Sequence, residues 1–481
     1  MRFGIVVTGQ PPGMFKVRQL VAGAWSEGGS GRTLTVLNPA DDTPVTVLGV
    51  AADEDVAAAV RAARDAAPEW ARTAPAARAA ALHAAAAAVE AAAGDLAETM
   101  SAEMGKPVDE ARDSITAGVG TLRQYAELGP VHRGRQLAGD DDAIDLMAYT
   151  PRGVVAVITP WNDPVAVAAG LLGAALVTGN TVVTKPSERS PATGWRLVEL
   201  LAPHFPPGVL NLVNGDGAVG AALAAQPVDV VAQVGSTATG RSIAAACART
   251  GAKALLENGG KDPLIVDAGV DPGWAAEQAA LGAFANAGQI CVAVERIYVL
   301  AEVAAEFLDR LAAEADSWAG RIGPLVDRRL RETVDEQVQQ AVKEGARALR
   351  GGAVPLGAGA YYPPTVLAGC TDEMAVMREE TFGPVAPVAT VSSFDEALRR
   401  AADSPYGLAA TLLTSSMSHA QRAWRTLPTG TVKVNAVFGG APGGAAHPRR
   451  GSGHGFGYGP ELLDEMTATR VAHLQAPPTG W

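Results

Sequence analysis

Cys291 and Glu257 are the two residues whose types and spacing suit covalent chemistry. Cys291 ends the segment FANAGQIC, just after a helical stretch, and the glycine and glutamine before it let the backbone turn sharply and expose an N–H. Glu257 lies 34 residues upstream (291 − 257) in LENGGK, where two glycines let a strand end bend toward a site. A thiolate is a nucleophile and a positioned carboxylate is a general base, so the pair suits attack on a carbonyl carbon.

Taken alone, each residue has a simpler interpretation. A single cysteine is more often a small buried apolar residue than a nucleophile, and a lone glutamate is more often an ion-pair partner. The other cysteines, Cys247 in a helical stretch and Cys370 in a turn, are interpreted as structural. No histidine falls in a catalytic or metal pattern, so no metal site is expected.

Length, charge and cysteine content narrow the class of protein. A chain of 481 residues with 48% apolar residues predicts two or three globular domains. The formal charge of −12 argues against a general nucleic-acid or anionic-membrane partner. Three cysteines make no disulfide framework, and no apolar run reaches the roughly 18 to 20 residues that span a bilayer. These features predict a cytoplasmic protein. Residues 1–13 are too short for a signal segment, and whether they are native stays open.

Alternating apolar runs and helical stretches begin at Gly153. Strands are expected at 154–159, 181–185, 209–214 and 228–234, and helices at 165–178, 194–202, 217–225 and 240–250. A second series runs from 263 to about 435, with helices at 272–286 and 303–319. The pattern predicts two α/β domains with parallel sheets that meet near 257–261. Upstream, alanine-rich stretches predict a helix from Asp53 to about 72 and one helical segment from 74 to 104.

These segments resemble the aldehyde dehydrogenase superfamily, of the non-acylating, NAD(P)-dependent type. In that family a Leu-Glu-x-Gly-Gly-Lys segment precedes Gly-Gln-x-Cys at this spacing. Further matches follow the family's order: TPWNDP at 159, GNTVVTKPSE at 179, PGVLN at 207, GSTATG at 235, EETFGP at 379, YGLA at 406 and VN at 434. The resemblance covers nearly all of the chain from about Val17 and implies the α/β fold of that family.

The resemblance implies a role for each reacting residue. Cys291, as a low-pKa thiolate, attacks the aldehyde carbon and forms a tetrahedral thiohemiacetal. The side-chain amide of Asn162 and the backbone N–H of Cys291 stabilise its oxyanion. Hydride passes to nicotinamide, and Glu257 activates the water that hydrolyses the acyl-thioester. Without the resemblance, Asn162 beside Pro164 would be interpreted as a turn residue.

The implied cofactor is NAD, with NADP possible. By resemblance, Lys185 and Glu188 approach the adenosine ribose, where a carboxylate disfavours a 2′-phosphate. The glycine-rich start of a helix after residue 234 presents N–H groups to pyrophosphate. Glu380 and Phe382 hold the nicotinamide ribose and ring. The predicted cofactor-binding residues are Thr159, Pro160, Trp161, Lys185, Ser187, Glu188, Gly215, Gly235, Ser236, Glu380 and Phe382.

Departures from the family pattern bear on the substrate. Asn258 replaces the usual leucine and is expected to place an amide beside the general base, and Gln233 stands where an aromatic residue is frequent. Asp163 occupies a position that is often aromatic in the family and lies near the substrate tunnel. A carboxylate there leads to the hypothesis that the substrate is a polar or cationic aldehyde rather than a long apolar one. Ile290 and Val292 are the other predicted substrate contacts. The loop 436–450 also departs from the family and is expected to rim the entrance.

The resemblance also implies a domain plan. It places a nucleotide-binding domain at 14–132 and 150–257, a catalytic domain at 258–440, and an oligomerisation arm at 133–149 and 460–481. An extended arm of this kind predicts a homodimer or homotetramer. Two alternatives stay open: a CoA-acylating dehydrogenase, against which the retained Glu257 counts, and a catalytically silent relative with a binding or structural role. The sequence identifies neither the aldehyde nor its pathway.

Overall fold

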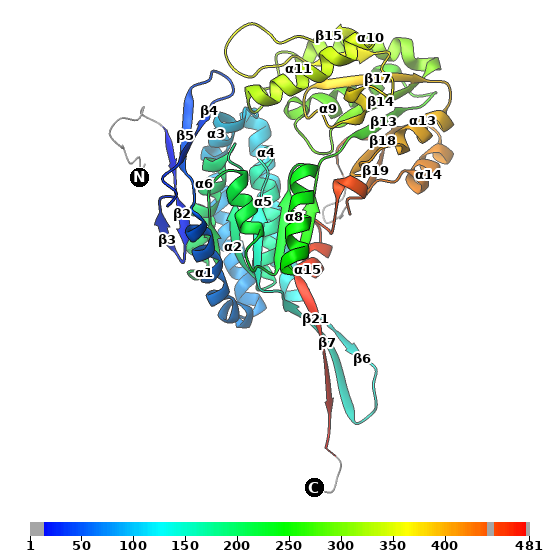
Figure 1. The fold of residues 1–481 in the computed structure, drawn as a ribbon. Coiled ribbons are helices and arrows are strands. Elements are labelled where there is room, and N and C mark those ends of the chain that lie inside the picture. Colours follow the sequence, from blue (N-terminus) through cyan, green and yellow to red (C-terminus); the bar gives the residue numbers. More distant parts are fainter. Residues whose placement is uncertain (1–13, 440–446, 478–481) are drawn as a thin grey trace.

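Two sheets, each covered by helices on both faces, account for most of the chain, and a narrow arm projects from one of them (Figure 1). The computed structural model describes residues 14–439 and 447–477. The predictions made for residues 1–13, 440–446 and 478–481 lie outside the described residues. No helix in the described ranges is long and apolar enough to cross a membrane.

The first sheet has eight strands, and its five central strands are parallel. In spatial order the strands are β20 (Gly453–His454), β12 (Lys253–Glu257), β11 (Val230–Val234), β8 (Val154–Ile158), β9 (Thr181–Lys185), β10 (Leu210–Leu212), β2 (Gln19–Val21) and β3 (Ala24–Ser26). The chain runs outward from β8 to β9 and β10, then returns to β11 and β12 on the other side of β8. The strand order therefore reverses between β8 and β11, and ligands of open α/β sheets bind at the carboxyl ends of strands at such a point.

Alternation along the strands buries both faces of this sheet. Val154 and Ala156 of β8 pack with one group of helices, and Val155 and Val157 pack with the other. The first group is α1 (Asp53–Arg72), α7 (Gly217–Ala224) and α8 (Thr237–Thr250). The second group is α2 (Pro75–Ala91), α3 (Ala93–Met104), α4 (Val108–Leu128), α5 (Pro164–Val177) and α6 (Pro191–Leu201), with short 3-10 turns at Gly129–Val131 and Ala202–His204.

The alanine-rich segment predicted as one helix is two. Helix α2 ends and α3 begins at Ala92, whose φ of −101° and ψ of 9° leave the helical range. Gly94 and Asp95 follow the break and are the local signal that the prediction of one helix passed over. Packing of the two helices against α4 and α6 fixes the bend.

The second sheet has seven strands, and all but the edge strand β15 are parallel. In order they are β15 (Arg347–Arg350), β16 (Thr365–Ala368), β17 (Val385–Val391), β14 (Val294–Leu300), β13 (Asp262–Val266), β18 (Ala409–Leu413) and β19 (Thr431–Val434). Helices α9 (Pro272–Phe284) and α10 (Ala301–Trp318) pack with one face. Helices α11 (Arg328–Lys343), α12 (Ala375–Arg378), α13 (Phe394–Ala402) and α14 (Met417–Thr426) pack with the other.

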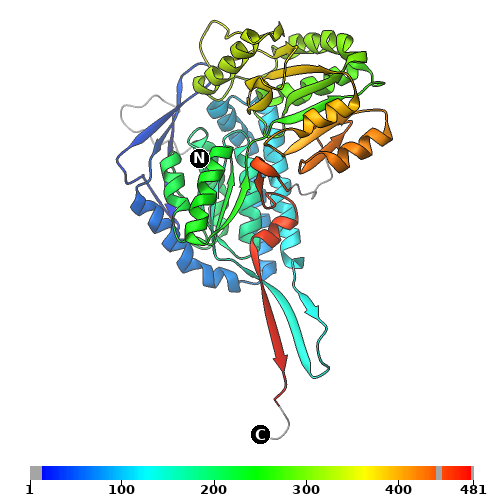
Figure 2. The same ribbon diagram turned by 45° about the vertical axis from the view of Figure 1, so that its right-hand side comes forward.

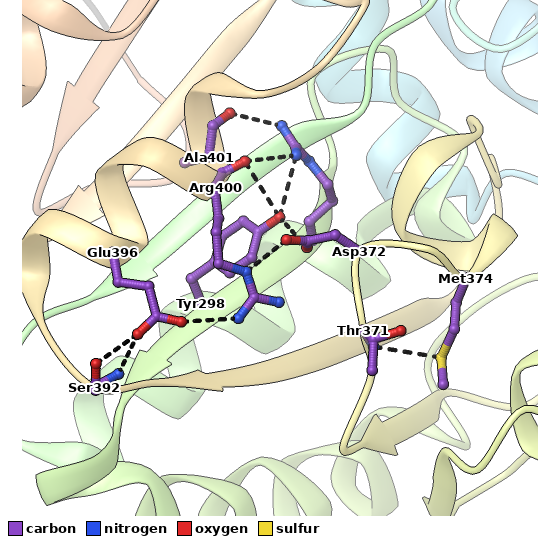
Figure 3. A network of polar contacts seen from close by, with 9 residues as sticks. Tyr298, Thr371, Asp372, Met374, Ser392, Glu396, Arg400 and Ala401 are labelled. Carbon is purple, nitrogen blue, oxygen red and sulfur yellow. Dashed lines mark hydrogen bonds and ion pairs between the residues drawn. The ribbon is translucent and has the colours of Figure 1, made fainter.

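A polar network joins α13 to the second sheet (Figure 3). The hydroxyl of Tyr298 on β14 donates to Asp372 Oδ1 at 2.9 Å, and Arg400 Nε donates to Asp372 Oδ2 at 2.6 Å. Arg400 also donates from Nη1 to Glu396 Oε1 at 3.4 Å, and Glu396 lies one turn before Arg400 on α13. The network lies on the face of the sheet opposite to α9 and α10, because Tyr298 belongs to the core formed with α13.

The arm is a three-stranded antiparallel sheet that extends away from the first unit (Figures 1 and 2). Its strands are β6 (Arg135–Leu137), β7 (Ala143–Pro151) and β21 (Thr467–Gln475). The predicted arm starts at residue 460, but α15 (Glu461–Glu465) comes first and buries Leu462 and Leu463 in the core of the first unit. A separate small sheet joins β1 (Phe15–Val17), β5 (Pro44–Gly49) and β4 (Thr33–Leu37). The roles assigned to the domains stay predictions.

Candidate active site

The segments expected to react follow the carboxyl ends of neighbouring parallel strands. Thr159, directly after β8, donates its N–H to the carbonyl of Lys185 at the end of β9 at 3.2 Å. On the other side of β8, Gly235 donates its N–H to the carbonyl of Glu257 at the end of β12 at 2.9 Å. The residues after β8, β9, β11 and β12 therefore share one edge of the sheet, at the point where the strand order reverses.

The loop that carries Cys291 has an unusual backbone. After α9 the 3-10 turn Ala285–Gly288 holds Asn286 and Ala287 at φ values of 48° and 54°, and Gly288 at 73°. Non-glycine residues in this left-handed region are strained, and such strain persists only where the surroundings fix it. Gln289 supplies part of that restraint, because its side chain donates to Asn286 O at 3.0 Å and accepts the N–H of Val326 at 2.8 Å.

Gly288 is required by a close backbone contact. A Cβ at this position would lie 2.1 Å from the carbonyl oxygen of Gly383, which is inside any van der Waals contact. The residues before Gln289 are buried, whereas Ile290, Cys291 and Val292 are all partly exposed. The structure thus places the two predicted substrate contacts on either side of the predicted nucleophile.

Asn162 joins the first sheet to this loop. Its Nδ2 donates to the carbonyl of Gln289 at 3.1 Å, two residues before Cys291. An amide nitrogen carries two N–H bonds, so one orients the side chain and the other stays available for an oxyanion. The structure therefore places the Asn162 side chain against the loop that carries Cys291.

Glu257 is the last residue of β12, and its carboxylate packs against the backbone of Gly457. A Cβ on Gly457 would lie 2.1 Å from the Glu257 carboxylate. The carboxylate accepts a hydrogen bond from the Gly457 N–H, which lowers its pKa. Although part of the side chain stays accessible, the surrounding protein raises its pKa to about 7 by burial. Its charge in turn raises the pKa of Cys291, so the two groups interact.

The expected low-pKa thiolate is not what the structure gives. Burial is the largest cause that raises the pKa of Cys291, to about 12, and carboxylates add to it. In decreasing order these carboxylates belong to Glu257, Asp262, Glu380 and Asp163. The sequence could not show this, because the four residues come from distant parts of the chain. The thiol of the resting protein therefore needs a compensating positive charge before it ionises at neutral pH.

Several of the residues predicted to bind the cofactor lie at the carboxyl end of β9 and form a cradle of polar groups. The Lys185 Nζ donates to Pro186 O at 2.9 Å and lies 3.6 Å from Glu188 Oε2, and burial lowers its pKa. Ser187 is nearly buried next to them and accepts the N–H of Arg189 with its hydroxyl at 3.3 Å. A lysine and a carboxylate at a strand end suit the hydroxyls of a ribose.

The start of α8 provides the phosphate side of the cradle. Ser236 caps the helix by accepting the N–H of Thr239 at 3.3 Å, and the first N–H groups of a helix attract anions. Gly235 does not contribute its own N–H, because that group already binds the carbonyl of Glu257. Gly215 lies at φ 156° before the cap of α7, where a Cβ would collide with Val219.

Aromatic rings and a carboxylate complete the cradle. Trp161, after the buried Pro160, meets Phe382 edge to face at 5.5 Å between ring centroids. Glu380 accepts the N–H of Gly260 at 3.1 Å, and a Cβ on Gly259 would lie 2.3 Å from its oxygens. Ribose hydroxyls, a phosphate and a flat ring each find a suitable group, so these residues fit a nicotinamide dinucleotide.

Two supporting residues were not assigned roles from the sequence. The Lys261 Nζ lies 2.8 Å from Glu295 Oε2 and 2.8 Å from Thr381 Oγ1, fully buried. Glu295 also accepts the N–H groups of Thr381 and Phe382 at 2.8 and 2.9 Å. This ion pair fixes the segment that carries Glu380. Lys261 belongs to a recognised motif, whereas nothing in the sequence marks Glu295.

Two departures from the family pattern have a structural outcome. The Ser114 hydroxyl donates to Asp163 Oδ1, and the buried Lys106 Nζ lies 3.9 Å from the same oxygen. Asn258 donates from Nδ2 to Gly451 O at 3.1 Å, whereas its Oδ1 is buried without a hydrogen-bond partner in the described residues. The expected entrance loop 436–450 falls partly on residues 440–446, outside the described residues.

Comparison with known proteins shows sequence similarity over nearly the whole chain. A profile of the aldehyde dehydrogenase family matches residues 25–472. The chain is 36% identical over 492 residues to the peroxisomal aminoaldehyde dehydrogenase 2 of Malus domestica, covering 96% of this chain and 97% of that protein. It is 35% identical over 488 residues to betaine aldehyde dehydrogenase 1 of Oryza sativa subsp. japonica, covering 96% of each.

A solved structure shows the same agreement in three dimensions. The NAD-dependent aldehyde dehydrogenase from Sinorhizobium meliloti superposes with a TM-score of 0.93 at 33% identity, covering 97% of this chain and 96% of that one. The predicted family, α/β fold class and cofactor class are confirmed. The chain belongs to the aldehyde dehydrogenase family and is an oxidoreductase that acts on aldehydes with NAD or NADP as acceptor.

Proposed function

We propose that the chain oxidises its aldehyde through a thioester on Cys291, with Asn162 as oxyanion donor and Glu257 as general base. The observation that carries this proposal is the hydrogen bond from Asn162 to the carbonyl of Gln289, which joins the end of β8 to the loop of the nucleophile. Glu257 interacts electrostatically with the same cysteine. The three residues come from different elements and meet at one edge.

The first step forms a bond between the sulfur of Cys291 and the aldehyde carbon. The carbonyl electron pair moves to oxygen, and the free N–H of Asn162 with the backbone N–H of Cys291 stabilises that negative charge. NAD, when bound, accepts the hydride that leaves this carbon. What remains on Cys291 is an acyl-thioester.

The second step hydrolyses the thioester. Glu257 takes a proton from water, the water oxygen bonds to the acyl carbon, and the carbon–sulfur bond breaks with its electron pair on Cys291. A carboxyl with a pKa of about 7 is suited to this role, since it is both ionised and basic near neutral pH. A retained base also argues against release of the acyl group to CoA.

We propose NAD as the preferred acceptor. Glu188 is partly exposed and lies 3.6 Å from the buried Lys185, so its carboxylate faces the position of the adenosine ribose. A 2′-phosphate at that position would meet a like charge. Location in the cytoplasm is likewise proposed, on the basis of three free cysteines and no membrane-spanning helix among the described residues.

We propose a cationic substrate, an aldehyde that carries a protonated amine. Asp163 is one residue from the oxyanion donor and its side chain is 34% exposed. Only its Oδ1 is engaged by Ser114 and Lys106 in the described residues, so Oδ2 remains to attract a cation. The aminoaldehyde and betaine aldehyde enzymes among its relatives agree with this charge.

The arm is proposed to bind a second copy of the chain. Ile144, Leu146 and Leu474 lie on one face of β7 and β21, since Leu474 pairs with Ile144. These side chains are 53%, 38% and 57% exposed, which is unusual for large apolar residues outside an interface. A homodimer or homotetramer would cover them.

The catalytic roles are tested by NADH formation at 340 nm with a panel of aldehydes. Cys291→Ala should give none, and Glu257→Gln should give a burst of about one NADH per site and then turn over at least about 100-fold more slowly. Cys370→Ala, a buried thiol, is the matched control and should stay active. If no aldehyde is oxidised by the wild type with or without CoA while NAD still binds, a silent relative is the better description.

The pKa of Glu257 makes a pH prediction. Hydrolysis needs the ionised carboxylate, so the rate of thioester hydrolysis should fall about tenfold per pH unit below about 7 and level off above it. Single-turnover hydrolysis of a preformed acyl-enzyme isolates this step. A profile in Glu257→Gln that still inflects near pH 7 would assign the titration to another group.

The charge of Asp163 predicts which class of aldehyde is oxidised with the higher kcat/KM. Asp163→Phe should lower kcat/KM for an amino-aldehyde relative to an alkanal of equal length by about tenfold, or about 1.4 kcal/mol. Ser114→Ala, which keeps the carboxylate, is the control. An unchanged ratio would remove Asp163 from substrate selection.

The apolar face of the arm predicts an effect on assembly. Leu146→Glu combined with Ile144→Glu should shift sedimentation toward the monomer, because two charges replace buried apolar area. Leu356→Glu, at a fully exposed position elsewhere, is the control. A wild type that already sediments as a monomer would contradict the proposal.

A further inference from the structure

Asp262 is a buried carboxylate that the proposed steps do not use. It begins β13 with 4% of its surface exposed. Its Oδ1 accepts the N–H of Ala409 at 3.1 Å, while its Oδ2 has no hydrogen-bond partner in the described part of the chain. A buried carboxylate with a free oxygen is costly unless a nearby positive charge compensates it.

Gly260 shows how close this carboxylate lies to the nucleophile. A Cβ on Gly260 would lie 2.9 Å from Asp262 Oδ1 and 2.7 Å from the carbonyl oxygen of Cys291. Both groups therefore pack against the same Cα atom. An ionised Asp262 opposes negative charge on the adjacent sulfur.

The register of the second sheet places Lys433 on the same face as Leu264. Leu264 of β13 pairs with Thr411 of β18, and Thr411 pairs with Lys433 of β19. Paired residues on neighbouring strands point to the same side of a sheet, so Leu264 and Lys433 share one face. Leu264 packs with α9, the helix whose end leads to Cys291.

Hydrogen bonding fixes the ammonium of Lys433 beneath that helix. Its Nζ donates to Val437 O at 2.6 Å and lies 5.5 Å from the ring centroid of Phe438. The Val437 Cβ lies 3.3 Å from the Cβ position of Gly282 in α9. Burial lowers the pKa of Lys433, and negative charge on either Asp262 or Cys291 raises it. Because the interaction of two charges is mutual, the ammonium favours the thiolate in return.

The other charges around the nucleophile already have partners or oppose ionisation. Three further carboxylates face Cys291 from other elements: Glu257, Glu380 and Asp163. Lys106 lies near Asp163, and Lys261 acts on Glu380 while it is bonded to Glu295. Lys433 is the cation whose own ionisation responds to Cys291.

We propose that Lys433 is the counter-charge of the Cys291 thiolate. Lys433 is thus a positioning residue, which acts on the nucleophile without touching the substrate. When the thiol loses its proton to solvent, sulfur keeps the electron pair and the new charge faces the ammonium. The inference rests on the proposed role of Cys291 but concerns ionisation of the thiol, which can be measured without turnover.

The test is the pH dependence of alkylation of Cys291 by iodoacetamide in the full-length chain, followed by peptide mass spectrometry. Lys433→Met should raise the pH of half-maximal rate by about one unit, so alkylation below that pH slows about tenfold. Lys433→Arg keeps the charge and should restore the wild-type midpoint.

Arg400→Met is the matched control. Arg400 pairs with Asp372 on the opposite face of the same sheet (Figure 3), so its loss should leave the midpoint unchanged. Circular dichroism checks that each variant is folded. A Lys433→Met midpoint equal to that of the wild type would overturn the proposal, as would a Lys433→Arg midpoint as high as that of Lys433→Met. If the midpoints move as expected but no aldehyde is oxidised, the charge pair stands and the proposed oxidation fails.

Discussion

The carbonyl of Gln289 is the point on which the reactive centre depends, because both halves of the molecule bind it. It accepts one amide N–H from Asn162, which follows β8 of the first sheet, and another from Asn286 in the loop itself. Two such bonds contribute about 1 kcal/mol each, whereas left-handed non-glycine residues cost about 1 to 3 kcal/mol each. These bonds alone do not offset the strain at Asn286 and Ala287. The Gln289 side chain and the carboxylate of Glu110, which accepts the Asn286 N–H at 3.1 Å, supply further restraint.

This restraint explains why the nucleophile lies between two rigid units rather than on one of them. A loop fixed only by the second sheet would place Cys291 without reference to the cofactor cradle, which the first sheet builds. Asn162 makes the connection, since it is both the anchor of the loop and the proposed oxyanion donor. Changing it would alter the position of the sulfur as well as the stabilisation of charge.

Much of this arrangement could be predicted from the sequence, and what could not depends on contacts over long distances. Strand β9 matches its predicted bounds, because four β-branched residues and Lys185 lie between turn signals. The break at Ala92 had only a weak local signal, Gly94 followed by Asp95, within a run of alanine. Glu295 has an ordinary position in a buried strand, and its partner Lys261 lies 34 residues away (295 − 261). The raised pKa of Cys291 likewise results first from burial and then from carboxylates, and both depend on how the fold packs around the loop.

The four carboxylates that act on the Cys291 sulfur differ in the cations near them. Asp163 has Lys106 nearby, Glu380 has Lys261, and Asp262 has Lys433. Glu257 differs from these three, since burial and the Gly457 N–H are the influences on its pKa in the described chain. Burial raises the pKa of Glu257 to about 7 and that of Glu380 to about 8, and it raises the pKa of Asp262 although Lys433 acts against it, so Glu257 titrates nearest to neutral pH among these three. Burial thus raises the pKa of the Cys291 thiol and also that of Glu257. Ionising the thiol while Glu257 keeps its raised pKa requires a cation near the sulfur and none near Glu257.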